Sequence, residues 1–297
     1  MSEPAALSAA PSEFTALGEL ARAAIGPSLQ ALLLFGSCLS AGLRQPGSIP
    51  DLLALVDDLD AALRHLGCGR LQRALGRTLP PLTLALVDPR AAACRGVVLA
   101  KLNVVTMATA QRAVAGLPDL PDLYLAGRLS KPVALLVARD AHGARAAAAL
   151  HRDALEQLID RTLRGLARDT RLVDAVDAVI GLSYRGEVRP EGAEKIAALR
   201  RSFPDFYQYA VPAVIAARAA ACGFTLAPLE PDHALLRDGR TAAQRRQDRR
   251  AVARLLRRSR WRAVLRWPRQ LVVYRGALGY VLGKLMRVRR QRGTAAR

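Results

Sequence analysis

Short apolar runs separated by turn residues dominate the first half of the chain. Runs of four to six residues bounded by glycine, proline or aspartate are typical of buried strands. The pattern predicts strands at residues 31–35, 51–56, 82–87, 96–99 and 132–137. The first run ends at Gly36-Ser37, which predicts a tight turn. Because helical stretches separate several of the strands, we expect an α/β or α+β sheet domain over about residues 15–140.

The pattern changes after Arg139 to alanine- and leucine-rich stretches with helical spacing. They predict helices at residues 144–166, 171–182, 192–201 and 205–222. Pro228 and Pro231 interrupt any helix near the end of this region. We therefore expect a sheet domain at residues 1–140, a mostly helical domain at 141–235 and a tail at 236–297. In the tail we expect a helix over 241–260, a break at Pro268 and an amphipathic stretch over 270–288.

Charge is concentrated at the end of the chain. The formal net charge is +20, and residues 240–297 hold 18 Arg, one Lys and one Asp, which leaves +2 for the first 239 residues. Basicity is therefore a property of the tail. The 51% hydrophobic content excludes a disordered chain and allows one large or two ordinary domains.

The four cysteines, Cys38, Cys68, Cys94 and Cys222, are far apart and form no CxxC pair. This spacing predicts reduced thiols, with neither a disulfide framework nor a zinc site. Residues 1–11 hold one acidic charge, Glu3, and lack the apolar core of a signal peptide, so we expect the protein on the cytoplasmic side.

The Gly36-Ser37 turn and an aspartate on the next strand suggest phosphate chemistry. Asp51 opens the second predicted strand, 14 residues after Ser37. A glycine-serine turn can offer backbone N–H groups and a hydroxyl to a phosphate, while strand carboxylates can hold Mg²⁺. Position 53, two residues after Asp51, is leucine, so Asp57, Asp58 or Asp88 would have to complete the metal site. The alternative is an ordinary turn in which Asp51 caps an exposed strand end.

Four blocks of sequence, in order, carry a resemblance to a known family. They are LFGS at 34–37 with SIPDLLALVDD at 48–58, KLNVV at 101–105, LYLAGRLSKPV at 123–133, and GLSYRGEVR at 181–189. Together they resemble the mitochondrial-type phosphatidate cytidylyltransferases, also called the translocator assembly and maintenance protein family. The third block is the most specific of the four.

The resemblance implies an enzyme that makes CDP-diacylglycerol from CTP and phosphatidic acid with Mg²⁺. It implies an α+β fold, with a nucleotidyltransferase-type mixed sheet domain, a winged-helix-like helical domain and a membrane-associating C-terminal helix. The chain departs from the family pattern at Leu102-Asn103, at Ser130 in place of histidine and at Glu187 in place of aspartate. Ser130 cannot act as an imidazole, and Glu187 reaches one methylene farther.

Candidate roles follow from the need to bring two anions together. We expect Asp51, Lys101 and Lys131 to be catalytic, with Mg²⁺ held by Asp51 and by Asp57 or Asp58. Phosphate contacts are expected from Gly36, Ser37, Arg128, Glu187 and Arg189. The alternative for Arg128 and Lys131 is a solvated pair in a loop. The alternative for Tyr184, Glu187 and Arg189 is a structural turn. Tyr124 is interpreted as a core residue. No general base is required, because a phosphate monoester is largely ionised near neutral pH, its second pKa being ~6.

The end of the tail has one apolar face, which includes Leu271, Tyr274, Leu278, Leu282 and Leu285. Arg275, Lys284 and Arg287 interrupt this stretch, so it is too charged to span a bilayer that needs ~20 apolar residues. We expect it to lie in the interface of an anionic membrane, as the anchor of a peripheral protein. The expected location is the cytoplasmic face of a bacterial inner membrane, or the matrix side of an organellar inner membrane.

Two other functions are compatible with the same residues. An arginine-rich helix with Trp261 and Trp267 could grip a polynucleotide, as in an RNA-directed nucleotidyltransferase or a nucleic-acid-binding protein. The apolar face after Pro268 favours a membrane over nucleic acid. The leucine at position 53 and the altered motif positions leave open a non-enzymatic scaffold.

Overall fold

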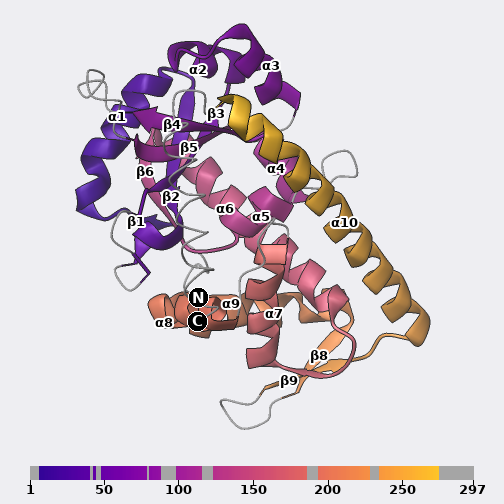
Figure 1. Cartoon of the computed structure of the whole chain (residues 1–297). Helices are drawn as coiled ribbons and strands as arrows, with labels where there is room; N and C mark the ends of the chain where they lie inside the picture. Colours follow the sequence, from indigo (N-terminus) through magenta and orange to yellow (C-terminus); the bar gives the residue numbers. More distant parts are fainter. Residues whose placement is uncertain are drawn as a thin grey trace, which may run out of the picture.

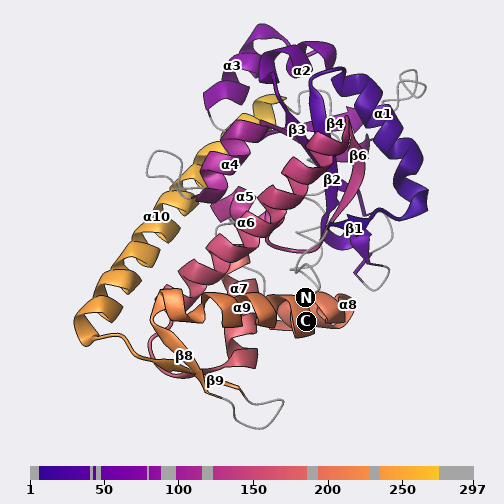
Figure 2. The same cartoon turned by 180° about the vertical axis from the view of Figure 1, so that it is seen from behind.

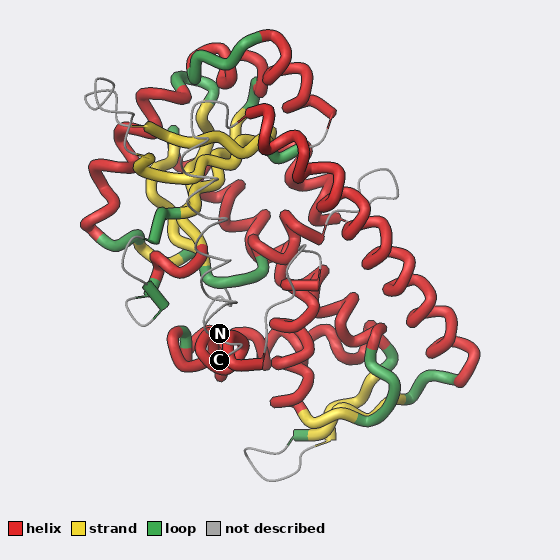
Figure 3. Tube along the Cα trace, viewed as in Figure 1, coloured by secondary structure: helices red, strands yellow, loops and turns green. Residues whose placement is uncertain are grey.

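The computed structural model describes residues 7–40, 43–44, 48–78, 80–87, 98–115, 123–185, 193–227 and 234–273. These residues form an α+β structure with a mixed sheet, a helical region that carries a small antiparallel sheet, and one long C-terminal helix (Figure 1). The two sheets lie at opposite ends of the molecule with helices between them (Figure 3).

Within the described residues, the main sheet has five strands of six or more residues and is extended at one edge by the two-residue β1. Its strands are β1 (Ser8–Ala9), β2 (Leu29–Phe35), β3 (Asp51–Val56), β4 (Leu82–Val87), β5 (Val98–Thr106) and β6 (Val133–Ala138), in the order β1-β6-β2-β3-β5-β4. Strand β3 runs parallel to β5, whereas β2 runs antiparallel to both β3 and β6. The end of β2 therefore lies beside the beginnings of β3 and β6, and β5 follows β3 in the sheet.

Helices cover both faces of this sheet, which explains why its central strands are almost entirely apolar. Leu32, Leu34 and Leu52 belong to a core shared with α1 (Thr15–Ile25) and α2 (Leu59–His65). Leu33 and Leu53 point to the opposite face, where α4 (Met107–Ala115), α5 (Leu123–Leu129) and α6 (Ala141–Gly165) pack. The alternation follows the two-residue period of a strand.

Strands β3 and β4 begin and end where the sequence predicts, and β2 and β6 differ from their predicted bounds by one or two residues. The prediction of a strand at 96–99 is wrong in extent, because β5 continues to Thr106. Lys101 and Asn103 interrupt its apolar pattern, yet both lie in register with β3. Pairing with β3 on one side and β4 on the other satisfies the backbone of β5 in spite of these polar side chains.

The helical region begins with α6, which contributes to two hydrophobic cores. Its first half supplies Ala147 and Leu150 to the core over the main sheet, and its second half supplies Leu158 and Ile159 to the core of the helical region. In Figure 2 this helix runs from the sheet into the helical region. The expected boundary at residues 140 and 141 thus lies at the start of a helix that joins the two parts.

The remaining helices of the described residues lie mostly around the second core. Around this core lie α7 (Leu172–Arg185), α8 (Ala193–Ser202), the π-helix η4 (Phe206–Ala210) and α9 (Val211–Ala219). Helix α3 (Arg70–Thr78) packs beside α2 instead. Short 3₁₀ turns lie at Ser12–Phe14, Gly36–Leu39 and Ala220–Cys222. The sequence predicts the positions of α7, α8 and α9. It does not predict the small sheet, whose strands β7 (Thr170–Arg171), β8 (Phe224–Ala227) and β9 (Leu235–Asp238) pair in the order β7-β9-β8.

Helix α10 (Ala242–Val273) extends along one side of the molecule, packs against α5 and α6, and reaches the edge strand β4 (Figure 1). The prediction that Pro268 breaks this helix is wrong, because α10 is continuous to Val273. Proline costs a helix interior about 3 kcal/mol, and the good helix formers before it offset that cost. Within the described part of the chain, no helix combines the length and the apolar character needed to cross a bilayer.

Candidate active site

The strand register brings four segments of the sequence motifs to one end of the main sheet. Phe35, the last residue of β2, lies opposite both Asp51 and Val133. Asp51 in turn lies opposite Lys101 in β5. The Gly36-Ser37 turn follows Phe35 directly, and Lys131 precedes Val133 by two residues. The topology of the sheet, and not proximity in sequence, gathers these residues.

Asp51 and Lys101 form an ion pair at this end of the sheet. Lys101 Nζ lies 3.1 Å from Asp51 Oδ1, and the two side chains are 22% and 25% exposed. Both side chains are thus mostly buried but partly accessible. The carboxylate can accept further contacts through Oδ2, because the lysine occupies only Oδ1.

Gly36 allows the chain to turn close to this carboxylate. Its φ of +85° lies in the left-handed region, which glycine adopts without strain. A Cβ at this position would lie 3.4 Å from Asp51 Oδ2, which is ordinary van der Waals contact, so the turn needs glycine for its φ and not for space. Ser37 lies in the 3₁₀ turn that follows, beside the buried Cys38, whose pKa is raised by burial.

Two further cations, Arg128 and Lys131, come from the last turn of α5 and from the segment that joins α5 to β6. The guanidinium Cζ of Arg128 lies 4.9 Å from the ring centroid of Phe35 and 4.4 Å from that of Tyr124. Lys131 Nζ lies 3.7 Å from the ring centroid of Tyr184 in the last turn of α7. All three distances are within the range of cation–π attraction. The structure therefore places Arg128 beside the residue that precedes the Gly36 turn.

Close contact between α5 and α7 fixes the place of the ring under Lys131. A Cβ on Gly127 would lie 2.4 Å from the carbonyl oxygen of Ser183, a distance that only glycine allows. Ser183 immediately precedes Tyr184. The third and fourth sequence blocks, which contain these residues, are thus in direct contact.

Asn103 is a buried polar residue to which the sequence analysis assigned no role. Its Oδ1 accepts hydrogen bonds from Thr83 Oγ1 at 2.8 Å and from the Tyr124 hydroxyl at 3.4 Å, while its Nδ2 donates to the Leu52 carbonyl at 3.0 Å. An asparagine in an otherwise apolar strand, two residues after Lys101, is the signal that could have identified it. Tyr124 packs against the core over the main sheet, as the sequence predicts, and it also contacts Arg128, which its position four residues earlier on the same helix could have indicated.

The expected metal set of Asp51, Asp57 and Asp58 is wrong as a single site. Asp57 and Asp58 follow the far end of β3, about 20 Å of strand from Asp51. There Asp57 pairs with Arg139 at 2.7 Å, and Asp58 caps α2. The Ala61 N–H lowers the pKa of Asp58, as expected of a capping carboxylate. One ion cannot bridge carboxylates at opposite ends of a strand.

Several other predicted positions lie outside the described residues. They are Asp88, Glu187, Arg189, Tyr274, Leu278, Leu282 and Leu285, and for Leu271 only the backbone is described, as part of α10.

Among the described residues, no group of three or more histidine, cysteine, aspartate or glutamate side chains could hold a metal ion. Mg²⁺ in phosphate-handling sites is commonly bound by one or two carboxylates together with substrate phosphates. Asp51 has one carboxylate oxygen that is not bonded to Lys101, so it fits the role of a single protein ligand to such an ion.

We compared the chain with protein-family models and with curated protein sequences. Neither comparison finds a match. The candidate site therefore rests on its own geometry and on the motifs described above.

Proposed function

We propose that this protein transfers a cytidylyl group from CTP to phosphatidic acid or a related lipid phosphate. The products are a CDP-lipid, such as CDP-diacylglycerol, and pyrophosphate. The observation that carries the proposal is the Asp51–Lys101 ion pair next to the Gly36 turn, with Arg128 against the ring of Phe35, the residue before that turn. Lys131 lies two residues before Val133, which is opposite Phe35 in the sheet. Three cations with one carboxylate suit a polyphosphate that arrives with a metal ion.

In the proposed reaction, an oxygen of the lipid phosphate attacks the α-phosphorus of CTP. The new P–O bond forms as the bond to the β-phosphate oxygen breaks, and pyrophosphate leaves with that electron pair. Lys101, Arg128 and Lys131 are proposed to bind phosphate oxygens and so to reduce repulsion between the two anions. Bound Mg²⁺, held by Asp51 and the phosphates, would add further charge neutralisation.

The arrangement of elements also supports the proposed family resemblance. A helix, a strand, a glycine-serine turn and a second strand that begins with aspartate occur in the order expected of a nucleotidyltransferase-type domain. In the helical region, the order α6, β7, α7, α8 and α9, β8 and β9 supports a winged-helix-like domain, with β8 and β9 as the wing.

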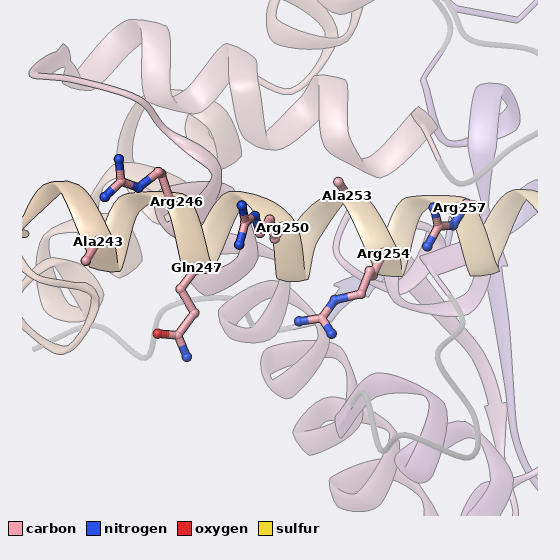
Figure 4. Close-up of a pocket in the computed structure, with 7 residues that line it drawn as sticks. All are labelled: Ala243, Arg246, Gln247, Arg250, Ala253, Arg254 and Arg257. Carbon is pink, nitrogen blue, oxygen red and sulfur yellow. The ribbon is translucent and has the colours of Figure 1, made fainter.

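The surface of α10 supports a peripheral association with an anionic membrane. Arg246, Arg250, Arg254 and Arg257 line one pocket along this helix (Figure 4). One turn farther, Trp261, Val264 and Leu265 are 65%, 52% and 54% exposed. Exposed apolar side chains next to arginines suit a lipid interface, where the rings and aliphatic groups enter the bilayer and the arginines contact headgroups.

The arginines of α10 also suit a polynucleotide, so an RNA-directed transferase is the second candidate. The deciding experiment supplies labelled CTP and Mg²⁺ with either phosphatidic acid vesicles or single-stranded RNA. We expect a labelled CDP-lipid from the wild-type protein, whereas label in RNA alone would select the second candidate.

Two aspartates at opposite ends of β3 provide the matched comparison. We expect Asp51→Asn to reduce the rate of transfer at least 100-fold, because the residue that holds the metal is lost. Asp57→Asn, at the far end of β3, should retain the wild-type rate within about twofold. Equal rates for the two variants would contradict the proposed site.

A further inference from the structure

A buried amide lies on the same face of the main sheet as the Asp51–Lys101 pair. Lys101 is opposite Asp51, and Asn103, two residues farther along β5, is opposite Leu53. Side chains two residues apart on a strand share a face, so Asn103 points to the face that α5 covers. Asn103 is 2% exposed, whereas both side chains of the ion pair are partly accessible. The amide therefore lies in the interior, one row of side chains behind the pair.

The hydrogen bonds of Asn103 fix the orientation of its amide. Its Oδ1 accepts from the Thr83 hydroxyl at 2.8 Å and from the Tyr124 hydroxyl at 3.4 Å. Its Nδ2 donates to the Leu52 carbonyl at 3.0 Å. A carbonyl oxygen can only accept a hydrogen bond, so the nitrogen side of the amide has to face β3. The two hydroxyls on the other side keep the amide from rotating.

The backbone on both sides of Asp51 is bonded to β5. The Pro50 carbonyl accepts from the backbone N–H of Lys101 at 2.8 Å, and the Leu52 carbonyl accepts from the Asn103 side chain. Asp51 is the first residue of β3, and the end of an element is where a chain opens most easily. These two bonds therefore limit the movement of the peptide groups that carry the Asp51 carboxylate.

Packing alone gives no reason for an amide at position 103. Leucine has nearly the same shape, and the core on this face of the sheet, which includes Leu53 and Val105, is apolar. A buried amide with its hydrogen bonds made and an apolar side chain of the same shape often differ little in their contribution to stability. A leucine, however, could not hold the Leu52 carbonyl.

We propose that Asn103 is a positioning residue, which acts through the Leu52 carbonyl to fix Asp51 where its carboxylate can hold a metal ion. The inference rests on the proposed function and identifies what orients the carboxylate that would bind the metal. Asn103 itself touches neither the metal ion nor a substrate. Removing a group that orients a metal ligand typically lowers metal affinity or activity about 10–100-fold.

The first test measures metal binding and requires no transfer. Mn²⁺ replaces Mg²⁺, inorganic triphosphate serves as the anion, and the relaxation rate of water protons reports the bound Mn²⁺. We expect Asn103→Leu and Asn103→Ser, neither of which can donate to the Leu52 carbonyl, to weaken Mn²⁺ binding about tenfold. Wild-type affinity in both variants would overturn the proposal.

Val105→Ala is the matched control for a general loss of stability. Val105 lies on the same strand and the same face as Asn103 and is also buried. The substitution should lower the unfolding temperature but leave Mn²⁺ affinity within about twofold of wild type, because it removes packing and no hydrogen bond. A loss of affinity equal to that of Asn103→Leu would show that the effect follows from destabilisation, and the positioning role would fail.

The second test follows transfer of label from CTP to phosphatidic acid vesicles while the Mg²⁺ concentration is varied. We expect Asn103→Leu to raise the Mg²⁺ concentration at half-maximal rate about tenfold and to leave the KM for phosphatidic acid within about twofold of wild type. A purely structural role would reduce the amount of folded enzyme, and thus the maximal rate, without changing the Mg²⁺ dependence. That result would contradict the positioning role.

The positioning role and the enzyme activity can fail separately. If the wild-type protein binds Mn²⁺ and triphosphate in an Asn103-dependent manner but transfers nothing to lipid, the proposed function fails and the positioning role stands. If the wild-type protein transfers the label and the Asn103 variants keep its metal affinity, the positioning role fails and the proposed function stands. If the wild-type protein binds no Mn²⁺ with triphosphate, both fail. Circular dichroism and the unfolding temperature of each variant establish that it is folded.

Discussion

The three cations of the candidate site are held by partners of different kinds. Lys101 pairs with the carboxylate of Asp51, whereas Arg128 and Lys131 lie against aromatic rings. A carboxylate partner cancels the lysine charge until a metal ion or a phosphate competes for one of the pair. An arriving polyphosphate would therefore compete with Asp51 for Lys101, and the opened pair would leave the Asp51 carboxylate available to a metal ion.

His151 predicts a pH dependence of stability. It is 1% exposed, contacts the Leu129 carbonyl through Nδ1 and stacks on Phe206, with 6.1 Å between the ring centroids. Burial lowers the pKa of His151 below its ordinary 6.5. Below about pH 6.5 the unfolded chain therefore binds a proton that the folded protein does not, and stability falls as the pH decreases.

We expect urea unfolding of the wild-type protein to show this loss of stability between pH 6.5 and 5. In His151→Gln the loss over that interval should be smaller, because the titrating group is gone. His142→Gln, at an exposed position near the start of the same helix, serves as the control and should leave the wild-type profile unchanged. An identical slope in all three proteins would show that His151 does not carry the effect.

At the scale of elements, Gly127 predicts a steric limit on the contact between α5 and α7. A Cβ there would lie 2.4 Å from a backbone oxygen that cannot rotate away, so Gly127→Ala should destabilise the fold by about 1–3 kcal/mol. Gly181→Ala is the matched control, because its nearest neighbour would be the Ile196 side chain at 4.0 Å. Alanine is also the better helix former, so Gly181→Ala should gain up to about 1 kcal/mol in urea unfolding. Equal effects would refute the close contact.

Arg240 joins the start of α10 to the helical region. Its buried guanidinium donates to the carbonyls of Arg164 and Leu166 at 3.0 and 2.9 Å and to the carboxylates of Asp238 and Asp248. Its hydrogen bond to Asp238 lowers the pKa of that carboxyl, which is 1% exposed. Removal of the guanidinium would leave a buried carboxylate without its main partner.

We therefore expect Arg240→Met to lower the free energy of unfolding by about 3–5 kcal/mol and to speed amide exchange in the first turns of α10. Arg245→Met is the comparison, since that side chain is 35% exposed and lies 3.7 Å from Asp238. It should cost less than about 1 kcal/mol. If the two variants unfold at the same urea concentration, Arg240 does not stabilise the packing of α10 against the helical region.

The sequence predicts the elements whose patterns are local. Strands β3 and β4 are apolar runs bounded by turn residues, and their predicted limits match the structure. Strand β5 and the small sheet are less predictable, because Lys101, Asn103 and the short strands β7 and β9 are held by neighbours distant in sequence. The continuation of α10 past Pro268 depends on a balance between the hydrogen bond that proline removes and the many residues of high helix propensity around it, and one proline does not decide that balance.

The same distinction holds for the candidate site. The glycine-serine turn, Asp51 and the two lysines were identifiable from their motifs, and the structure brings Asp51 and Lys101 into contact. The metal role of Asp57 and Asp58 could have been excluded from the sequence, because the strand predicted at 51–56 already separates them from Asp51 by about 20 Å. The partners of Arg128 and Lys131 follow from packing between α5, β2 and α7, which no local pattern records.

At the scale of the whole molecule, charge separates the chain into two parts. Residues 240–297 carry +18 of the net +20, and α10 brings part of that charge alongside the main sheet. Arg246, Arg250, Arg254 and Arg257 line a pocket on α10 close to the exposed Trp261. A surface of this kind would hold the protein at an anionic bilayer, where a lipid phosphate is available to a site on the same molecule.

This arrangement predicts how the protein partitions onto vesicles. Replacing Arg246, Arg250, Arg254 and Arg257 with glutamine should weaken binding to vesicles that contain phosphatidic acid by two to three orders of magnitude, since each basic residue contributes about 1 kcal/mol near such a surface. Binding of the wild-type protein should also fall as salt rises, because ions screen the attraction. Flotation of labelled protein measures both effects, and Trp261 fluorescence should shift to shorter wavelength on binding.

The matched control removes the same charge elsewhere. Four arginines outside α10 each pair with a carboxylate, so changing all four to glutamine leaves α10 intact. They are Arg22 in α1, Arg64 in α2, Arg77 in α3 and Arg171 in β7. If attraction to the membrane depended only on net charge, the two sets of substitutions would weaken flotation equally. We expect the α10 set to have at least a tenfold greater effect, because those four arginines lie together beside exposed apolar side chains and can approach the bilayer at once. Loss of RNA binding with unchanged flotation would assign this surface to nucleic acid instead.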